Sequence, residues 1–276
     1  MIKLERGDLV KIAVLQLAVS KDKQVNNLNA KNKIIQASLS GVDLVVLPEM
    51  FNTTYNPYKF EEFSEPEGGP TYKMLRELAK ERNIYIVGGS IPESFEGKLY
   101  NTSYVFNRSG ECIAKYRKNH LFDIDIQGGQ KFKESATLSA GNEIAVFETE
   151  FGKIGVMICF DVRFAEFAKR YTLEDCVMVV VPANFNMTTG PLHWELLFRT
   201  RAIDNQMFYV GCASSRNPMA SYVNYGNSII TDPMGKIVKR MNEHSGVMIQ
   251  DINLDLVKKV RNQIPVVNNS KFKKSA

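Results

Sequence analysis

The sequence offers one thiol in a setting that suits nucleophilic chemistry. Cys159 follows the alternating apolar residues of segment 153–158, a pattern typical of a strand, and precedes a polar turn. Ligands of α/β proteins bind at the carboxyl ends of strands, and a helix N-terminus at that edge favours a thiolate. Most cysteines are nevertheless buried and inert. Cys159 alone therefore does not predict an enzyme.

Two charged residues occupy comparable places in other segments. Glu49 ends the apolar segment 42–49, and Lys118 ends the predicted strand 111–118. A carboxylate at a strand end is partly desolvated, which raises its pKa toward the range of a general base. Taken singly, Glu49 is as well explained as a turn carboxylate and Lys118 as a solvated lysine. Together with Cys159, they indicate a Glu-Lys-Cys site.

Histidine is the more common partner of a catalytic cysteine. His120 and His193 are the candidates, but neither lies in a recognisable family signature, and His193 is surrounded by residues of a predicted helix. A Cys-His hydrolase is therefore the less favoured alternative. The sequence has 4 cysteines without a CxxC pair and 3 histidines, so we expect no metal site and no cofactor.

The elements that must position these residues alternate in the first part of the chain. Strand patterns cover 11–17, 42–49 and 84–90, and helical patterns lie between them. The second helix is expected to begin after Pro70, whereas the first is predicted from apolar residues at helical spacing. Those residues are Val25, Leu28, Ile35 and Leu39. This β-α-β-α-β order indicates a sheet with helices packed on it.

The rest of the chain begins with a hairpin and then repeats the alternation. Segments 99–107 and 111–118 read as the hairpin, and 119–138 lacks periodicity and is expected to be a long functional loop. Further strands are predicted at 143–149, 153–159, 176–183, 207–214, 225–232, 235–240 and 246–253, with helices after Cys159 and after Ala183. Two halves of similar rhythm predict two sheets in one domain of 1–276, with a tail of about ten residues.

Composition excludes several classes of protein. The chain is 44% apolar and 24% charged with a net charge of +5, and it has neither a concentrated basic face nor a nucleic-acid-binding motif. The first eleven residues lack the apolar core of a secretion signal, and no run approaches the roughly 18 apolar residues of a membrane span. We expect a cytoplasmic protein that binds neither nucleic acid nor membrane.

Three separated motifs match one family. They are LPEMF at 47–51, YRKNHLFD at 116–123 and CFDVRF at 159–164, and they contain the glutamate, the lysine and the cysteine in turn. In these motifs, and over nearly the whole chain, the sequence resembles the nitrilase superfamily of carbon-nitrogen hydrolases. That resemblance implies an α-β-β-α sandwich, a Glu-Lys-Cys triad and a thioester intermediate.

Further stretches resemble the omega-amidase branch, which hydrolyses the terminal amide of 2-oxoglutaramate and 2-oxosuccinamate to the dicarboxylate and ammonia. They are GGSIPE at 88–93, KLYNTSYVF at 98–106, KNHLFDIDI at 118–126, FKESATLSAG at 132–141, NFNMTTGPLHWELLFRTRAIDNQ at 184–206, ASYVNYGNS at 220–228 and QIPVV at 263–267. The sequence departs from the family at Phe160, where tyrosine is common, at Asn119, where an aliphatic residue is common, and at Gly128 to Gln130. These departures affect substrate preference more than reaction type.

The resemblance also implies roles for individual residues. Glu134 becomes a second carboxylate that holds Lys118, and the backbone N–H of Phe160 helps to stabilise the oxyanion. The family further implies a homodimer, for which helices 163–171 and 192–205 are candidate interface elements.

The far carboxylate of such a substrate needs a cationic or hydroxyl-rich anchor, and a bidentate arginine is the usual solution. The candidates are Arg163, Arg199, Arg201, Tyr55, Thr188 and Thr189. Each arginine is also explained as a salt-bridge partner on a helix surface. The alternatives to an omega-amidase are a deaminated glutathione amidase, an N-carbamoyl amidohydrolase and a non-catalytic nitrilase-like module.

Overall fold

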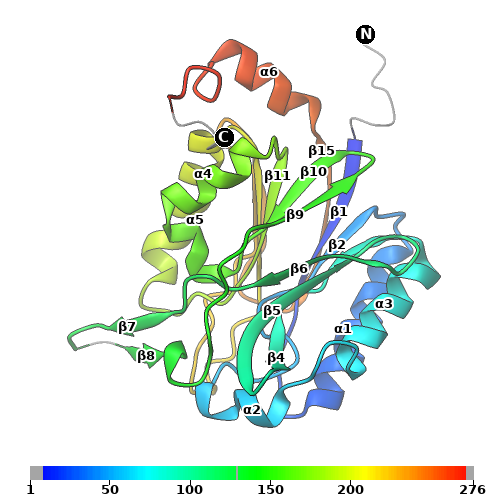
Figure 1. Ribbon diagram of the computed structural model, residues 1–276, viewed down its shortest axis with the longest axis vertical. Helices are drawn as coiled ribbons and strands as arrows, with labels where there is room; N and C mark the ends of the chain where they lie inside the picture. Colours follow the sequence, from blue (N-terminus) through cyan, green and yellow to red (C-terminus); the bar gives the residue numbers. More distant parts are fainter. Residues whose placement is uncertain (1–8, 129, 272–276) are drawn as a thin grey trace.

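The computed structural model describes residues 9–128 and 130–271 of the chain. Two β-sheets face each other across a shared apolar core, and helices cover both outer faces (Figure 1). Each sheet contains parallel and antiparallel pairs, so the predicted sandwich of two mixed sheets flanked by helices is confirmed. The predicted tail extends beyond Lys271, and the segment that was expected to lack a secretion signal includes residues 1–8, so both predictions lie partly outside the described residues.

The first sheet has seven strands, built from β1 (Leu9–Gln16), β2 (Leu44–Val46), β3 (Tyr85–Val87), β4 (Ile91–Phe95), β5 (Lys98–Phe106), β6 (Cys112–Arg117) and β15 (Gly246–Asn253). The order is β15-β1-β2-β3-β5-β4, and β6 also pairs with β5. β1, β2 and β3 run parallel, as the alternating pattern predicts. β15 pairs antiparallel with β1, so a strand from the end of the chain completes the first sheet.

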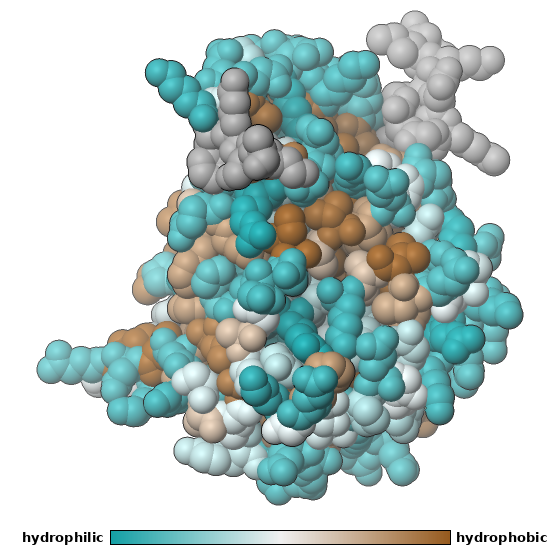
Figure 2. All heavy atoms as spheres, in the orientation of Figure 1, coloured by the Kyte–Doolittle hydropathy of each residue, from teal (hydrophilic) through white to brown (hydrophobic). Residues whose placement is uncertain are grey.

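The second sheet has six strands, built from β9 (Ala145–Thr149), β10 (Gly152–Val156), β11 (Met178–Ala183), β12 (Phe208–Ala213), β13 (Ile229–Thr231) and β14 (Ile237–Arg240). Here β10, β11 and β12 are parallel, and their order is sequential. On the face shown in Figure 2, apolar side chains gather where β6 and β9 lie side by side and the edges of the two sheets meet. Ile113 and Val146 are half-buried there.

The helices cover the sandwich from three sides. They are α1 (Lys23–Ser38), α2 (Phe60–Phe63), α3 (Pro70–Arg82), α4 (Ala165–Leu173), α5 (Gly190–Asn205) and α6 (Asp255–Gln263). Figure 1 shows α1 and α3 on the outer face of the first sheet, α4 and α5 on that of the second, and α6 at one end. The sequence prediction omitted α2, α6 and β4. No helix in the described residues is long and apolar enough to cross a membrane.

The first helix is where predicted, but most of the residues that predicted it are not on its buried face. Ile35 packs partly buried against the core, whereas Val25, Leu28 and Leu39 are exposed. The helix buries Asn26, Ala30, Ile34 and Ala37. Asn26 is buried because its amide oxygen accepts hydrogen bonds from the Ser20 backbone N–H at 2.7 Å and the Ser20 hydroxyl at 3.0 Å. The two alanines allow the helix to approach the sheet closely, so small residues mark the packed face.

The segment 119–138 is also more ordered than predicted. It forms the small sheet of β7 (Asp123–Asp125) and β8 (Lys131–Lys133), followed by the 3-10 turn η3 (Glu134–Ala136). Phe132 of β8 packs against the rings of Tyr55 and Tyr222, with centroids 5.2 and 5.3 Å away. This hairpin therefore places an aromatic side chain beside the residues described next.

Candidate active site

Glu49 lies just after β2 and is completely buried. The chain reaches this position past a close approach, because a Cβ atom on Gly89 would lie 2.1 Å from the Pro48 carbonyl oxygen. Gly89 has φ +57°, which suits glycine. The carboxylate of Glu49 therefore depends on a tight contact between the ends of neighbouring strands.

Lys118 follows β6, and its ammonium is also completely buried. Its Nζ lies 2.9 Å from Glu49 Oε1 and 2.8 Å from Glu134 Oε2. Burial alone would lower the pKa of Lys118, but the carboxylates of Glu134 and Glu49 outweigh it and raise that pKa. Lys118 is therefore a fixed cation between two carboxylates.

Glu134 belongs to η3, which places its side chain under the β7–β8 hairpin. Its Oε2 also accepts a hydrogen bond from the Phe122 backbone N–H at 2.6 Å, and its Oε1 accepts one from the Tyr55 hydroxyl at 2.7 Å. Tyr55, proposed as a substrate ligand, thus lies in the polar cluster, where its hydroxyl is also 3.2 Å from Glu49 Oε1.

Two asparagines that the sequence analysis did not single out complete the cluster. Asn101 of β5 donates to Glu49 Oε1 at 2.9 Å. The Asn184 backbone N–H donates to Glu49 Oε2 at 2.9 Å, while its side-chain amide donates to the Glu49 carbonyl at 2.7 Å. Both lie in stretches that resemble the omega-amidase branch, and Asn184 directly follows β11. A search for polar residues after each parallel strand would have found Asn184.

Cys159 begins the 3-10 turn η4 (Cys159–Arg163), directly after the strand-like segment that continues β10. Its φ is +49°, a left-handed conformation that non-glycine residues seldom adopt. Such strained turns persist when their surroundings fix them, and they concentrate at functional sites. The thiol is only 3% exposed.

The electrostatics of the site keep Glu49 and Cys159 protonatable. Burial raises the pKa of Glu49 above 4.5 against the opposing effect of Lys118, and the Glu134 carboxylate adds to the rise. Burial, followed by the Glu49 carboxylate, raises the pKa of the Cys159 thiol well above 9.0, although Lys118 opposes the shift. A carboxylate with a raised pKa therefore acts electrostatically on a protonated thiol in the same buried site.

Arg163 ends η4 and is half-buried near the thiol. Its guanidinium stacks over the rings of Phe185 and Phe160, at 4.8 and 5.5 Å from the centroids. One nitrogen lies 3.1 Å from His193 Nδ1, and no carboxylate of the described residues lies within 4.0 Å. Burial lowers the pKa of Arg163, while Cys159 and Tyr222 oppose that shift. Among the proposed anchors, it is the cation beside the thiol.

The other proposed anchors have their polar groups occupied by the fold. Arg201 donates to the carbonyl groups of Val162 and Arg163 at 2.8 and 2.9 Å, and Arg199 donates to the carbonyl of Gly235 at 2.9 Å. The Thr189 hydroxyl donates to Asn186 Oδ1 at 3.1 Å. Thr188 is exposed, and its backbone N–H donates to the same oxygen.

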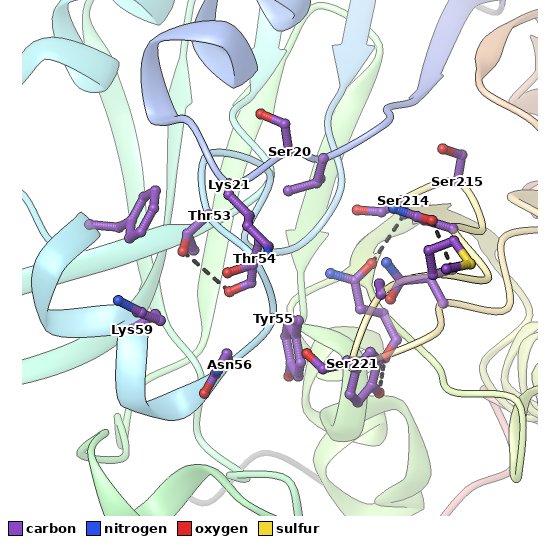
Figure 3. Close-up of a pocket in the computed structure, with 18 of the residues that line it drawn as sticks. Ser20, Lys21, Thr53, Thr54, Tyr55, Asn56, Lys59, Ser214, Ser215 and Ser221 are labelled. Atoms are coloured by element: carbon purple, nitrogen blue, oxygen red, sulfur yellow. Dashed lines mark hydrogen bonds between the residues drawn. The ribbon is translucent and has the colours of Figure 1, made fainter.

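A cavity of about 930 Å³ reaches the polar cluster from the surface. Figure 3 shows Tyr55 at its centre, with Thr53 and Lys59 on one side and Ser214 and Ser215 on the other. Asn184 and Tyr222 also line it, and the Tyr222 hydroxyl donates to the Asn184 carbonyl at 2.6 Å. Two of the residues that hold Glu49, Tyr55 and Asn184, are therefore also part of the cavity wall, whereas Cys159 is not among its lining residues. No group of three or more potential metal ligands gathers anywhere in the described part of the chain.

Comparison with known proteins places this geometry in a family. A family model described as carbon-nitrogen hydrolase matches residues 11–262. Omega-amidase NIT2 of Danio rerio is 45% identical over 256 residues, covering 93% of this chain and 92% of that protein. Omega-amidase NIT2 of Homo sapiens is 43% identical over 256 residues, covering 93% of each. The crystal structure of Saccharomyces cerevisiae Nit3, a member of branch 10 of the nitrilase superfamily, matches with a TM-score of 0.88 at 37% identity, covering 96% of this chain and 97% of that one.

Proposed function

The chain belongs to the carbon-nitrogen hydrolase family, and we propose from this premise that it is an omega-amidase acting on 2-oxoglutaramate and 2-oxosuccinamate. The observation that carries the proposal is the buried Glu49 carboxylate, which is bound to Lys118 at 2.9 Å and whose charge raises the pKa of the Cys159 thiol. The choice of amide follows the relatives that are omega-amidases.

In this proposal Glu49 is the general base. The thiol of Cys159 is protonated at rest because burial raises its pKa well above 9.0. Glu49 removes that proton as Sγ attacks the amide carbon, and then transfers it to the leaving nitrogen, which departs as ammonia. The acyl group remains on Cys159 as a thioester.

Water completes the reaction with the same carboxylate. Glu49 takes a proton from a water molecule as the water oxygen attacks the thioester carbon, and the bond between that carbon and Sγ breaks. The proton then returns from Glu49 to the departing thiolate, and the dicarboxylic acid leaves. One water is consumed for each ammonia released.

Lys118 and the Phe160 backbone N–H are the proposed oxyanion donors. Lys118 is held in place by two carboxylates, so it needs no rearrangement during the reaction. The first backbone hydrogen bond within η4 runs from the Asp161 N–H to the Ile158 carbonyl, at 3.1 Å. The Phe160 N–H lies one residue before this donor. It therefore belongs to the group of helix-start donors that have no intrahelical acceptor. Glu134 has the role of holding Lys118.

Arg163 is the proposed anchor for the far carboxylate of the substrate. It is half-buried, and no carboxylate within residues 9–128 and 130–271 pairs with it. A desolvated guanidinium binds a carboxylate more strongly than an exposed one. Arg163→Met should raise KM for 2-oxoglutaramate by about 10- to 100-fold, since a charge-assisted bond contributes 1.5–3 kcal/mol. Arg199→Met is the matched control, and an equal rise in KM there would contradict the assignment.

A substrate panel with ammonia as the readout tests the function. Cys159→Ala should abolish ammonia release from 2-oxoglutaramate, and retained turnover would refute a thioester mechanism. Release of carbon dioxide along with ammonia would identify a carbamoyl hydrolase instead. A preference for a glutathione-derived amide would change the substrate but not the chemistry.

The proposal extends to assembly and setting. Leu192 and Leu196, one turn apart on α5, are 70% and 64% exposed, and they support a homodimer in which α5 packs against its copy. Leu196→Arg should therefore shift the mass measured by light scattering from dimer to monomer.

A cytoplasmic setting is supported by the need to keep Cys159 reduced, and all four cysteines are free thiols.

A further inference from the structure

Asp161 joins three segments around the nucleophile. It lies two residues after Cys159 and is completely buried. Its Oδ2 accepts hydrogen bonds from the Ile158 backbone N–H at 2.9 Å and the Tyr116 hydroxyl at 2.6 Å. Its Oδ1 accepts the His120 backbone N–H at 2.9 Å and lies 2.7 Å from His120 Nδ1. One carboxylate thus bonds to the turn of Cys159, to β6 and to the residue two places after Lys118.

The His120 ring is held on two sides. It stacks on Phe164 with centroids 3.7 Å apart and planes 14° from parallel, and it meets Phe167 edge-on at 4.9 Å. An ionised carboxylate only accepts hydrogen bonds, so Nδ1 must carry the proton in the bond to Asp161. Each partner in this bond therefore has a defined orientation.

The two sides of this bond come from different sheets. Lys118 follows β6 of the first sheet, whereas Cys159 follows β10 of the second. The strained φ of +49° at Cys159 needs surroundings that fix it, and the Asp161 bonds provide such fixing on the Cys159 side. The His120 bond then ties this fixed turn to the Lys118 segment.

We propose that His120 is a positioning residue that, through Asp161, sets the position of the Cys159 thiol relative to Lys118 and Glu49. This inference rests on the proposed function. In the proposed function Glu49 is the base, since its carboxylate acts on the Cys159 thiol and raises its pKa, whereas the His120 ring contacts Asp161, Phe164 and Phe167. His120, which the sequence analysis considered as the base of a Cys-His hydrolase, is in this proposal a residue that positions the site.

The kinetic test compares two replacements of His120. His120→Phe keeps a ring on Phe164 but removes the N–H donor, so kcat should fall about 30- to 100-fold with KM changed less than about twofold. His120→Asn retains an N–H donor and should recover about tenfold of the lost kcat. His244→Phe, at an exposed histidine, is the matched control and should match the original protein. A kcat for His120→Phe within about twofold of the original would overturn the proposal.

Tyr116→Phe provides a second test if His120→Phe does not fold. It removes one donor to Asp161 without touching the histidine, and kcat should fall about fivefold at unchanged KM. Unchanged kcat in this variant would likewise contradict a positioning role for the Asp161 cluster.

Alkylation by iodoacetamide separates this inference from the proposed function, since it needs no substrate. If Asp161 and His120 position the thiol, His120→Phe should slow alkylation of Cys159 alone, and the buried Cys176 and Cys212 should stay protected. Faster alkylation of all three would show general loosening and would overturn the inference. A protein inactive on every amide, with slowed Cys159 alkylation in the variant, would refute only the proposed function.

Discussion

Two buried charge clusters in the first sheet have opposite compositions. In one, Lys118 lies between Glu49 and Glu134, so two carboxylates share one cation. In the other, Glu93 lies between Lys115 and Arg117, at 2.5 and 2.8 Å, so two cations share one buried carboxylate, and Lys115 also pairs with the exposed Glu67 at 2.8 Å. The three members of the first cluster are completely buried, whereas the cations of the second are about a quarter exposed.

The difference determines which carboxylate can accept a proton. Burial raises the pKa of Glu49, and a single shared cation does not offset it. Burial would also raise the pKa of Glu93, but hydrogen bonds from Arg117, Lys115 and Thr102 outweigh it and hold that pKa below 4.5. Glu49 shares one cation with a second carboxylate, so it is suited to accept a proton. Glu93 is paired with two cations, so it stays ionised and serves the structure.

Removing the shared cation should have the largest effect. Lys118→Met leaves Glu49 and Glu134 buried without their partner, so we expect loss of about 3–5 kcal/mol of stability. Turnover should fall at least about 10³-fold, because the proposed oxyanion donor is lost as well. Urea unfolding and ammonia release measure the two effects, and a stable variant would show that the cluster does not depend on its cation.

Neutralising Glu49 should remove activity and cost some stability. Glu49→Gln should lower kcat about 10²- to 10⁴-fold. Its amide oxygen still accepts the bonds from Lys118 and Asn101, but its NH2 group faces the Asn184 backbone N–H, so the melting temperature should also fall.

The unmodified protein should show the matching pH dependence. Because the raised pKa of Glu49 requires a proton to be lost before catalysis, kcat/KM should fall on acidification with a midpoint above 4.5. The raised pKa of Cys159 predicts no alkaline fall below 9.0. A midpoint at or under 4.5 would contradict the assignment of Glu49 as base.

The second carboxylate of the first cluster should matter less than the base. Glu134→Gln keeps Lys118 paired with Glu49, so turnover should fall about 10- to 100-fold, with KM little changed. An effect as large as that of Glu49→Gln would mean that Glu134 itself takes part in proton transfer.

The second cluster should yield a change in stability alone. Glu93→Gln should leave kcat within about twofold and cost about 1–2 kcal/mol, since its cations are partly solvated. A carboxylate whose pKa is lower in the folded than in the unfolded protein stabilises the fold at every pH above its unfolded-state pKa. That stabilisation is lost as the pH falls through the folded-state pKa. The gap in melting temperature between the two proteins should therefore narrow below about pH 4.5.

The positions of Glu49, Lys118 and Cys159 could be predicted because strand ends are visible as apolar runs followed by polar residues. Asn101 was missed because it lies within a strand, where polar residues usually face solvent. The buried face of α1 was misjudged because its packing depends on small residues and on Asn26, whose burial becomes favourable only with Ser20 in place. Local sequence indicates where strands and helices end, whereas the residues that pack against them or bond to them often come from distant segments.

The pairing of β1 with β15 has a consequence for how the protein is made. Leu9 pairs with Asn253 and Gln16 with Gly246, so this edge of β1 has no strand partner until residues 246–253 have left the ribosome. Contacts of such long sequence separation slow folding, and an unpaired strand edge invites association with other chains. A nonsense codon before Gly246 would therefore release a protein that still carries Glu49, Lys118 and Cys159 but leaves β1 open to aggregation.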